Sequence, residues 1–492
     1  MRRRFALLPV LVALALLAAG CGGSTSTKAG GSSSGASVAP ASAPIFVSVD
    51  TDPGSGQWKQ ADELLSKFPA KQKLLAFVDR ELAKQGVSYA QDIKPALGPE
   101  VDVVVLSLAK GNRDVVGMVK PTDKAKLQAL LAKIAAKDPT SKTVTAEYQG
   151  WTLVSDKQSA LDTLESDAAM GSLADDGTFK EAMANESADS LVSAYVNGAA
   201  LQQLVGEFGG AAGCATGTDT GQVKLRYIGG ALAAEADGLR LHGTIRSDNA
   251  PSSGGGDTKT LLSEIPSGAL AVLAFHGTDQ FTQGFQALQQ CQGATKSFQQ
   301  FESLLGVKLK DLGALFAGET ALYVRAGSPI PEVTLIAHQQ DAQAALGTID
   351  TLAKRLGSLF GGLPRDTTLD GVPAKELVVG GRVSIFYAAL GDKVVVTDSR
   401  AGFADLRGSG PKLKDDAAFK DAEKASGLDD SATAFLYVDL KDAIPLVEDL
   451  VQLAGVQIPP DVDANLQPLR SFVIYGSGTA GKAEFTAFLE LQ

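Results

Sequence analysis

The sequence predicts an α+β fold made of two degenerate tandem copies, each an antiparallel sheet with packed helices. Three observations predict it: motifs of the first half return in the second, strand-like segments are mostly separated by short turns, and helix-like segments lie between groups of strands. Short turns between neighbouring strands favour antiparallel pairing over a doubly wound parallel sheet. At 492 residues the chain also exceeds the roughly 100 to 200 residues of a single domain.

The second half of the chain repeats motifs of the first half in the same order. The matching segments are residues 92–100 and 311–319, 173–180 and 413–420, 194–197 and 436–439, and 225–226 and 469–470. The shift between the members of a pair grows from 219 to 244 positions along the chain. Chance matches would not stay in order with a drift in one direction, so we interpret the body of the chain as a duplication.

Composition sets the boundaries of the two copies. Residues 45–250 form copy one, residues 264–492 form copy two, and the segment 251–263, which begins with Pro, Ser and Gly, is expected to link them. Copy two carries roughly twenty additional residues, and the strand-like segment 382–387 among them predicts an added strand.

Hydrophobic periodicity predicts individual elements within the copies. Apolar residues recur at i, i+3, i+4 and i+7 from Leu127, which predicts a helix over 123–136 with a counterpart over 341–356. The end of the chain predicts a hairpin, with alternating apolar and polar residues over 472–491 interrupted by a turn through 476–481.

The N-terminus is typical of a lipoprotein signal peptide. Residues 1–20 hold three arginines, an apolar run and then small residues directly before Cys21. The run Leu-Ala-Ala-Gly-Cys resembles the bacterial lipobox, although Ala18 stands where that pattern usually has Leu. The resemblance implies a secreted lipoprotein with palmitate-type chains on Cys21, held on the outer face of the bacterial cytoplasmic membrane. The Gly/Ser/Ala-rich segment 21–44 is expected to be a flexible tether.

Charge excludes several classes of partner. Removal of residues 1–20 takes away three arginines and no acid, which changes the formal net charge from −11 to −14. A nucleic-acid-binding protein would need clustered Lys and Arg, so we expect no nucleic acid as a partner. After the signal peptide no run approaches the length of about 18 apolar residues that a membrane helix needs, so the lipid is the expected membrane anchor.

No motif predicts a cofactor, a nucleotide or a metal. Residues 476–483 fit the phosphate-binding pattern G-x-x-x-x-G-K until Ala483, which stands where the pattern needs Ser or Thr, and a strand follows instead of a helix. We interpret this segment as a glycine-rich turn. His242, His276 and His338 each stand alone, which disfavours a local zinc site, and His276 is interpreted as part of a strand-to-helix turn.

Two cysteines remain after Cys21, and two pairs of acids invite a functional interpretation. Cys214 and Cys291 are a possible disulfide in an oxidising compartment, and free thiols or pairing between chains are the alternatives. The acid pairs at 175–176 and 415–416 lack the spacing of a calcium loop. They directly precede helix-like segments, so we interpret them as helix N-terminal caps.

The repeated plan, the lipobox and the LGPE-like step before a strand together resemble a family of exported bacterial proteins catalogued as domain of unknown function thirty-three fifty-two. The resemblance covers most of the body of the chain. It implies a repeated α+β envelope protein and carries over no catalytic or ligand residue.

Three hypotheses for function follow. The first is a non-enzymatic envelope lipoprotein that binds an envelope protein or an apolar ligand held between helices and sheet. The second is an extracytoplasmic hydrolase whose site is assembled from distant residues, for which three histidines provide little material. The third is a purely structural spacer. A sizeable pocket in either copy would separate the first hypothesis from the third.

Overall fold

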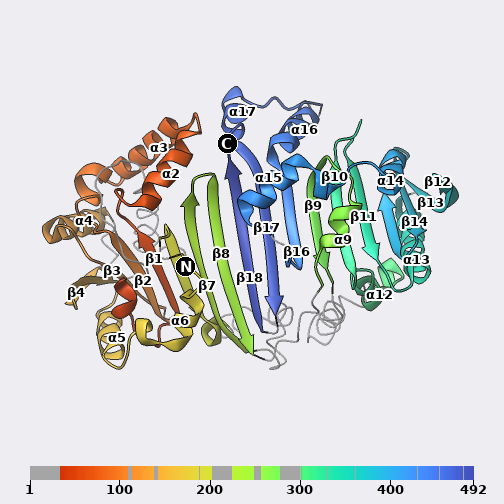
Figure 1. Ribbon diagram of the computed structural model, residues 1–492. Helices are drawn as coiled ribbons and strands as arrows, with labels where there is room; N and C mark the ends of the chain where they lie inside the picture. The colour runs from red at the N-terminus through yellow and green to blue at the C-terminus, as the bar shows by residue number, and fades with distance from the viewer. Residues whose placement is uncertain are drawn as a thin grey trace.

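One continuous antiparallel sheet of eighteen strands runs through the computed structural model, with helices on both faces (Figure 1). The structure describes residues 34–492 except 109–112, 138–141, 188, 202–223, 249–255, 278–299, 301, 329, 361, 429, 454 and 480. The prediction of mixed helices and antiparallel strands is therefore confirmed.

The first half contributes eight strands. They are β1 (Ile45–Asp50), β2 (Glu100–Ser107), β3 (Asp114–Val119), β4 (Val144–Tyr148), β5 (Trp151–Ser155), β6 (Val192–Asn197), β7 (Lys224–Glu235) and β8 (Gly238–Asp248). The described helices of this half are η2 (Ser34–Ser37), α2 (Gly56–Ser66), α3 (Lys71–Lys84), η3 (Tyr89–Ile93), α4 (Lys124–Lys137), α5 (Gln158–Ala168), η4 (Leu173–Asp175) and α6 (Gly177–Met183).

The second half contributes ten strands. They are β9 (Ala269–His276), β10 (Glu319–Arg325), β11 (Glu332–His338), β12 (Arg365–Leu369), β13 (Val372–Val379), β14 (Val383–Leu390), β15 (Lys393–Thr397), β16 (Ala434–Asp439), β17 (Leu469–Thr479) and β18 (Lys482–Leu491). The described helices of this half are α9 (Lys259–Glu264), α12 (Leu309–Ala314), α13 (Ala342–Phe360), α14 (Arg400–Arg407), η6 (Leu413–Asp415), α15 (Ala417–Ser426), α16 (Leu440–Leu453) and α17 (Pro460–Leu466).

The two halves follow the same strand order, running outward from the middle of the sheet. The first half reads β8-β7-β6-β1-β2-β3-β5-β4 and the second β18-β17-β16-β9-β10-β11-β15-β14-β13-β12. Their registers agree as well: Phe46 of β1 lies opposite Tyr195 of β6, and Val272 of β9 lies opposite Tyr437 of β16. The two tyrosines are 242 positions apart, the shift that the sequence motifs give.

The expectation of one sheet per copy is corrected by the pairing of β8 with β18. These last strands of the two halves run antiparallel over their whole length, from Arg246 opposite Lys482 to Gly238 opposite Glu490. At the midpoint His242 lies opposite Thr486. Each strand would otherwise leave an unpaired sheet edge, and the pairing satisfies both edges at once.

The predicted flexible tether over 21–44 is also corrected, because the described fold begins at Ser34. Residues Ser34–Ser37 form the short helix η2, and Ala36, Val38 and Ala39 are buried. The carboxylate of Glu100 accepts hydrogen bonds from the Ser34 hydroxyl at 2.6 Å and from the Gly35 amide at 3.2 Å. Small residues pack closely against the sheet here, so a composition poor in large apolar side chains does not indicate a tether.

The linker predicted over 251–263 is also too long, because its last residues belong to the fold. Helix α9 begins at Lys259 within it, and Leu261 is fully buried in the core of the second half. Helix α9 takes the place of η2: Leu173 donates its amide to the carbonyl of Ala39 in the first half, and Leu413 donates to Ile265 in the second. Residues 251–255 lie outside the described residues.

Two finer predictions are refined by the strands. The segment 382–387 forms strand β14 as predicted, but it is not the added strand, because β14 takes the place of β4 in the strand order. Among the described strands, those without a counterpart in the first half are β12 and β13, a hairpin beyond β14 at the sheet edge. The turn predicted through 476–481 is shorter, because β17 continues to Thr479, which lies opposite Lys482.

The predicted amphipathic helices are α4 and α13, and both begin at an aspartate. The Asp123 carboxylate accepts the amides of residues 125 and 126, and that of Asp341 accepts the amides of residues 343 and 344. Such caps satisfy amides that have no partner within the helix. Helix α13 is longer, at 19 residues against 14 for α4.

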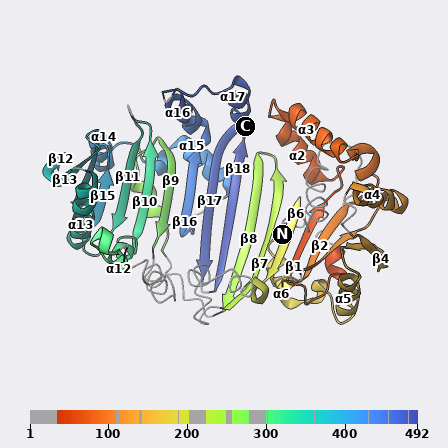
Figure 2. The same ribbon diagram turned by 180° about the vertical axis from the view of Figure 1, so that it is seen from behind.

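Side chains alternate between two faces of the sheet. The front face, toward the viewer in Figure 1, carries Phe46 and Tyr437 and is covered by η2, α5 and α6 in the first half and by α9, α14 and α15 in the second. The rear face, toward the viewer in Figure 2, carries Val101 and Leu335 and is covered by η3, α3 and α4 in the first half and by α12 and α13 in the second.

Candidate functional site: an apolar cavity in the second half

A cavity of about 560 Å³ lies between α12, α13 and the rear face of the second half. Its volume falls within the roughly 300–1,000 Å³ of typical small-molecule sites. The described lining residues are Leu309, Leu312, Leu315 and Phe316 around α12, Ile349, Leu352, Ala353 and Leu356 on α13, and Leu335, Ala337, Gln339, Leu377, Ile385, Tyr387, Val394 and Val396 on or next to the sheet. All but Gln339 and Tyr387 are apolar.

The sequence produces this lining through two periodicities. Along α13 the lining positions Ile349, Leu352, Ala353 and Leu356 follow helical spacing, so they share one side of the helix. Along β15 the lining positions Val394 and Val396 alternate with the front-face residue Val395, which is fully buried. The helix and the sheet therefore turn apolar surfaces toward each other.

The corresponding place in the first half is a filled core. Leu312, Leu315 and Phe316 line the cavity, and their counterparts at the shift of 219 are Ile93, Ala96 and Leu97, which are at most 5% exposed. These residues pack with Leu82 and Val87 at the end of α3 in one cluster with the rear face of the sheet. The same plan thus gives a core in one half and a cavity in the other.

Both polar side chains of the cavity wall hydrogen-bond to the protein itself. The Tyr387 hydroxyl donates to the Asp350 carboxylate at 2.9 Å, and the Gln339 side-chain amide donates to the Leu315 carbonyl at 2.7 Å. Burial raises the pKa of the Tyr387 phenol far above its usual value, so the hydroxyl stays protonated. Asp350 is balanced by the ammonium group of Lys354 at 2.7 Å. This wall suits an uncharged ligand surface rather than a reacting group.

A smaller and more polar hollow lies near the middle of the sheet, on the first half. It has a volume of about 200 Å³, and Glu186, Asp189, Glu235, Arg240 and His242 are among its lining residues. His242 Nδ1 lies 3.1 Å from the Glu186 carboxylate, whose side chain is 1% exposed. That hydrogen bond raises the pKa of His242, against the opposing effect of burial.

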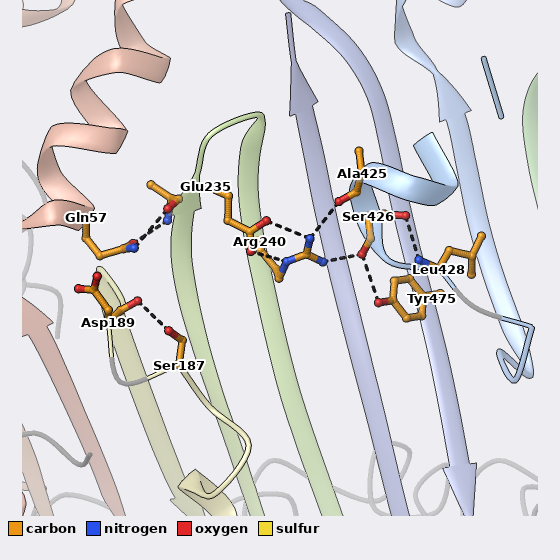
Figure 3. Close-up of polar contacts among 10 residues, drawn as sticks. Gln57, Ser187, Asp189, Glu235, Arg240, Ala425, Ser426, Leu428 and Tyr475 are labelled. Carbon is orange, nitrogen blue, oxygen red and sulfur yellow. Dashed lines mark hydrogen bonds and ion pairs between the residues drawn. The ribbon is translucent and has the colours of Figure 1, made fainter. Parts of the chain in front are cut away.

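Arg240 in this hollow joins the two halves of the molecule (Figure 3). Its guanidinium forms a two-point ion pair with Glu235 at 2.6 and 3.0 Å and donates to the carbonyls of Ser426 at 2.5 Å and Ala425 at 3.0 Å, at the end of α15. The guanidinium also lies over the Phe488 ring, 4.6 Å from its centroid. With its donors engaged in this way, Arg240 is a structural tie rather than a ligand-binding group.

The histidines that the sequence singled out have separate contacts in the described part of the structure. Cys21, Cys214 and Cys291 lie outside the described residues. His338 is held by Glu264 at 3.0 Å and Asp392 at 3.1 Å. His276 ends β9 as expected for a strand end. No group of His, Cys, Asp or Glu within the described ranges is arranged to hold a metal ion.

Two interpretations of polar motifs are confirmed. Asp176 accepts the Phe179 amide at 2.7 Å and Asp416 accepts the Phe419 amide at 3.1 Å, so the second acid of each pair caps α6 or α15. The phosphate-loop-like segment is a β-hairpin, in which Gly476 and Gly478 lie in β17, Gly481 lies in the turn and strand β18 follows.

Sequence reasoning identified the apolar face of α13 and left open whether it packs in a core or borders a ligand held between helices and sheet. Ile349, Leu352 and Leu356 were recognisable from their spacing, yet the same spacing in α4 packs into a closed core. One difference between the copies that the structure reveals is length: α13 continues for more than a turn beyond the position where α4 ends.

Comparisons with known proteins give a family and no activity. A family model described as "Protein of unknown function (DUF3352)" matches residues 6–171 and 157–491. No curated protein matches the chain. Crystal form IV of TP0453 is similar at 14% identity and a TM-score of 0.25, over 44% of this chain and 74% of that chain; crystal form I gives 13% and 0.24, over 46% and 77%. Within the described residues, no helix has the length and hydropathy to cross a membrane.

Proposed function

The chain belongs to the DUF3352 family of proteins of unknown function, and we propose that it is a non-enzymatic binding protein that holds an apolar ligand in the cavity of its second half. The observation that carries the proposal is the cavity of about 560 Å³, in which fourteen of the sixteen described lining residues are apolar. Burial of apolar surface contributes roughly 25 cal/mol per Å², so a wall of this kind provides affinity without charge.

Two further observations support binding over catalysis. The polar groups of the wall, Tyr387 and Gln339, are engaged by Asp350 and the Leu315 carbonyl, which leaves them to shape the cavity. The hydrolase alternative would need a nucleophile within hydrogen-bond reach of a base. Both ring nitrogens of His338 contact carboxylates, Asp392 and Glu264, so neither is left to act as a base.

We propose that binding takes place outside the cytoplasm, on a protein anchored through lipid on Cys21. The support is the sequence of residues 1–21, with its basic, apolar and small-residue regions before the cysteine. The two halves would then be tandem copies with diverged duties, one a closed support and one a binding unit. A disulfide between Cys214 and Cys291 stays a prediction.

Intact mass spectrometry of membrane-extracted protein tests the anchor and the disulfide. We expect an N-terminus at a lipid-modified Cys21, release of the Cys21→Ala variant to the medium, and a mass gain on reduction if Cys214 and Cys291 pair. An unmodified Cys21 on freely shed protein would overturn the anchor, while leaving the cavity to be tested separately.

Titration with the compact apolar fluorophore N-phenyl-1-naphthylamine tests the cavity. We expect saturable binding to the wild-type protein and a loss of binding in Ala353→Phe, which places a ring in the cavity. The matched control Leu453→Phe changes a residue that is 80% exposed on α16 and should bind as the wild type does. Absence of saturable binding, or equal binding by the Ala353→Phe variant, would overturn the proposal.

A further inference from the structure

An apolar row on the rear face of the sheet leads directly out of the cavity. Leu335 of β11 lines the cavity and lies opposite Leu322 of β10, which lies opposite Leu273 of β9. Leu273 in turn lies opposite Leu436 of β16, and Leu436 lies opposite Ile474 of β17. Figure 2 shows these five strands side by side, next to α12 and α13.

The row is linear because its members are direct cross-strand partners. Neighbouring strands lie about 4.8 Å apart, so five strands carry the row over about 19 Å. Every member is a Leu or Ile, and Leu322 and Leu273 are 40% and 42% exposed. Exposed apolar residues that occur singly need no explanation, but an aligned row that begins in an apolar cavity forms a continuous surface.

We propose, building on the apolar-ligand function above, that the ligand is a long alkyl chain, with one end in the cavity and the rest laid along this row. A compact apolar molecule would use the cavity alone. The row has the shape of an extended chain and offers no charged side chain along its length, which fits methylene groups and excludes a polar or branched polymer. A free fatty acid and an acyl chain of a membrane lipid share this chemistry.

The first half offers a contrast on the same face of the sheet. The row continues from Ile474 to Ala487 of β18 and then to Leu241 of β8, which is 42% exposed. Leu241 matches Leu273 in residue type, exposure and face, but lies beyond the five strands and beyond a small alanine. It therefore provides a control for a general effect of removing apolar surface.

Displacement of N-phenyl-1-naphthylamine by butyrate, palmitate and hexadecanol tests the proposal on the full chain. We expect palmitate and hexadecanol to displace the probe and butyrate to fail. The double variant Leu322→Gln with Leu273→Gln should weaken palmitate by at least about tenfold, because each buried methylene contributes about 0.8 kcal/mol. The same variant should bind the probe itself as the wild type does, and Leu241→Gln should change neither affinity.

The outcomes separate the two proposals. If the probe fails to bind at all, the cavity function falls. The probe could bind while palmitate affinity is unchanged by the double variant or is lowered equally by Leu241→Gln. Either result would overturn the proposal that an alkyl chain lies along the row, and the cavity function would stand. Lipid vesicles are a second arm: lipid retained on the protein in native mass spectrometry identifies a membrane lipid as the source, and retention of palmitate alone identifies free fatty acids.

Discussion

The rear face of the sheet is closed in the first half and hollow in the second, although the two halves share strand order and register. In the first half, Leu127, Leu130 and Leu131 of α4 pack with the rear side of the sheet and with the end of α3. In the second half, the matching side of α13 borders a cavity of about 560 Å³. The comparison teaches that a duplicated fold can keep its hydrogen-bonded framework while the packing between a helix and the sheet differs between the copies.

The largest expected effect on stability comes from shortening a side chain in the closed core of the first half. Leu131→Ala should lower the free energy of unfolding by about 3 kcal/mol, because Leu131 is 4% exposed and its removal leaves an unfilled space. Ile349→Ala, at the counterpart position on α13, should cost less than half as much, since Ile349 already borders a space. Chemical denaturation of both variants measures the difference, and equal costs would contradict the comparison.

The next effect concerns the tie between the halves. Arg240→Met should cost about 2 kcal/mol, because charged hydrogen bonds to Glu235, Ala425 and Ser426 are lost. Arg400→Met is the matched control: Arg400 also lies over a phenylalanine ring, Phe386, at 4.5 Å, but bonds only within the second half. Because the β8–β18 ladder still joins the halves in this variant, calorimetry should show one transition at a lower temperature. An unchanged transition temperature would show that Arg240 does not stabilise the contact between the halves.

A smaller effect depends on pH and belongs to the second half. Both ring nitrogens of His338 face carboxylates, Glu264 and Asp392, so the ring is protonated, and the hydrogen bond to Glu264 is the largest cause that raises its pKa. Lys393 also contacts Glu264. A raised folded-state pKa gives stability that is complete below the unfolded value of about 6.5 and is lost as the pH rises through the folded value.

His338→Gln should therefore remove about 1 kcal/mol at low pH and flatten the loss of stability that the wild-type protein shows as the pH rises above about 6.5. The first-half counterpart, Lys120, lies near the Trp151 ring. Part of the dependence of stability on pH should remain in this variant, because the pKa of His242 is also raised. Denaturation midpoints across the pH range measure this effect. If the midpoints of the variant and the wild type change with pH in parallel, His338 does not cause the pH dependence.

The smallest effect is expected where α3 of the first half meets α17 of the second. Lys73 and Asp461 form an ion pair there, but their side chains are 71% and 75% exposed. Lys73→Ala should change stability by less than about 0.5 kcal/mol, because exposed ion pairs are weak and screened by salt. A cost comparable to that of Arg240→Met would contradict the expected ranking of these two side-chain contacts between the halves.

The sequence motifs and the alternation of apolar residues predicted the duplicated plan and the type of each element. They did not predict how well side chains fill the space between elements, or which distant strands pair. The ordered motifs anticipated the agreement of register at Tyr195 and Tyr437, and the aspartate pairs were recognised as caps. The joining of the halves through β8 and β18 was missed because either strand alone has the pattern of a sheet edge. The folded segment from Ser34 was missed because its small residues resemble a tether.

The cavity was beyond sequence reasoning for a related physical reason. Spacing identifies an apolar helix face but not whether the opposing surface fills the space between them. Ile349 and its counterpart Leu131 look equivalent in sequence, and one borders a hollow while the other is buried in a core.

The central claim is that usable space exists on the rear face of the second half and not of the first, and an identical enlargement on both sides tests it most directly. Ala353→Leu adds volume at a residue that lines the cavity. Ala96→Leu adds the same volume in the closed core, where Ala96 is fully buried. Denaturation of both variants should show Ala353→Leu as stable as the wild type or more so, and Ala96→Leu destabilised by about 1–3 kcal/mol through overpacking. Equal destabilisation of the two variants would contradict the account.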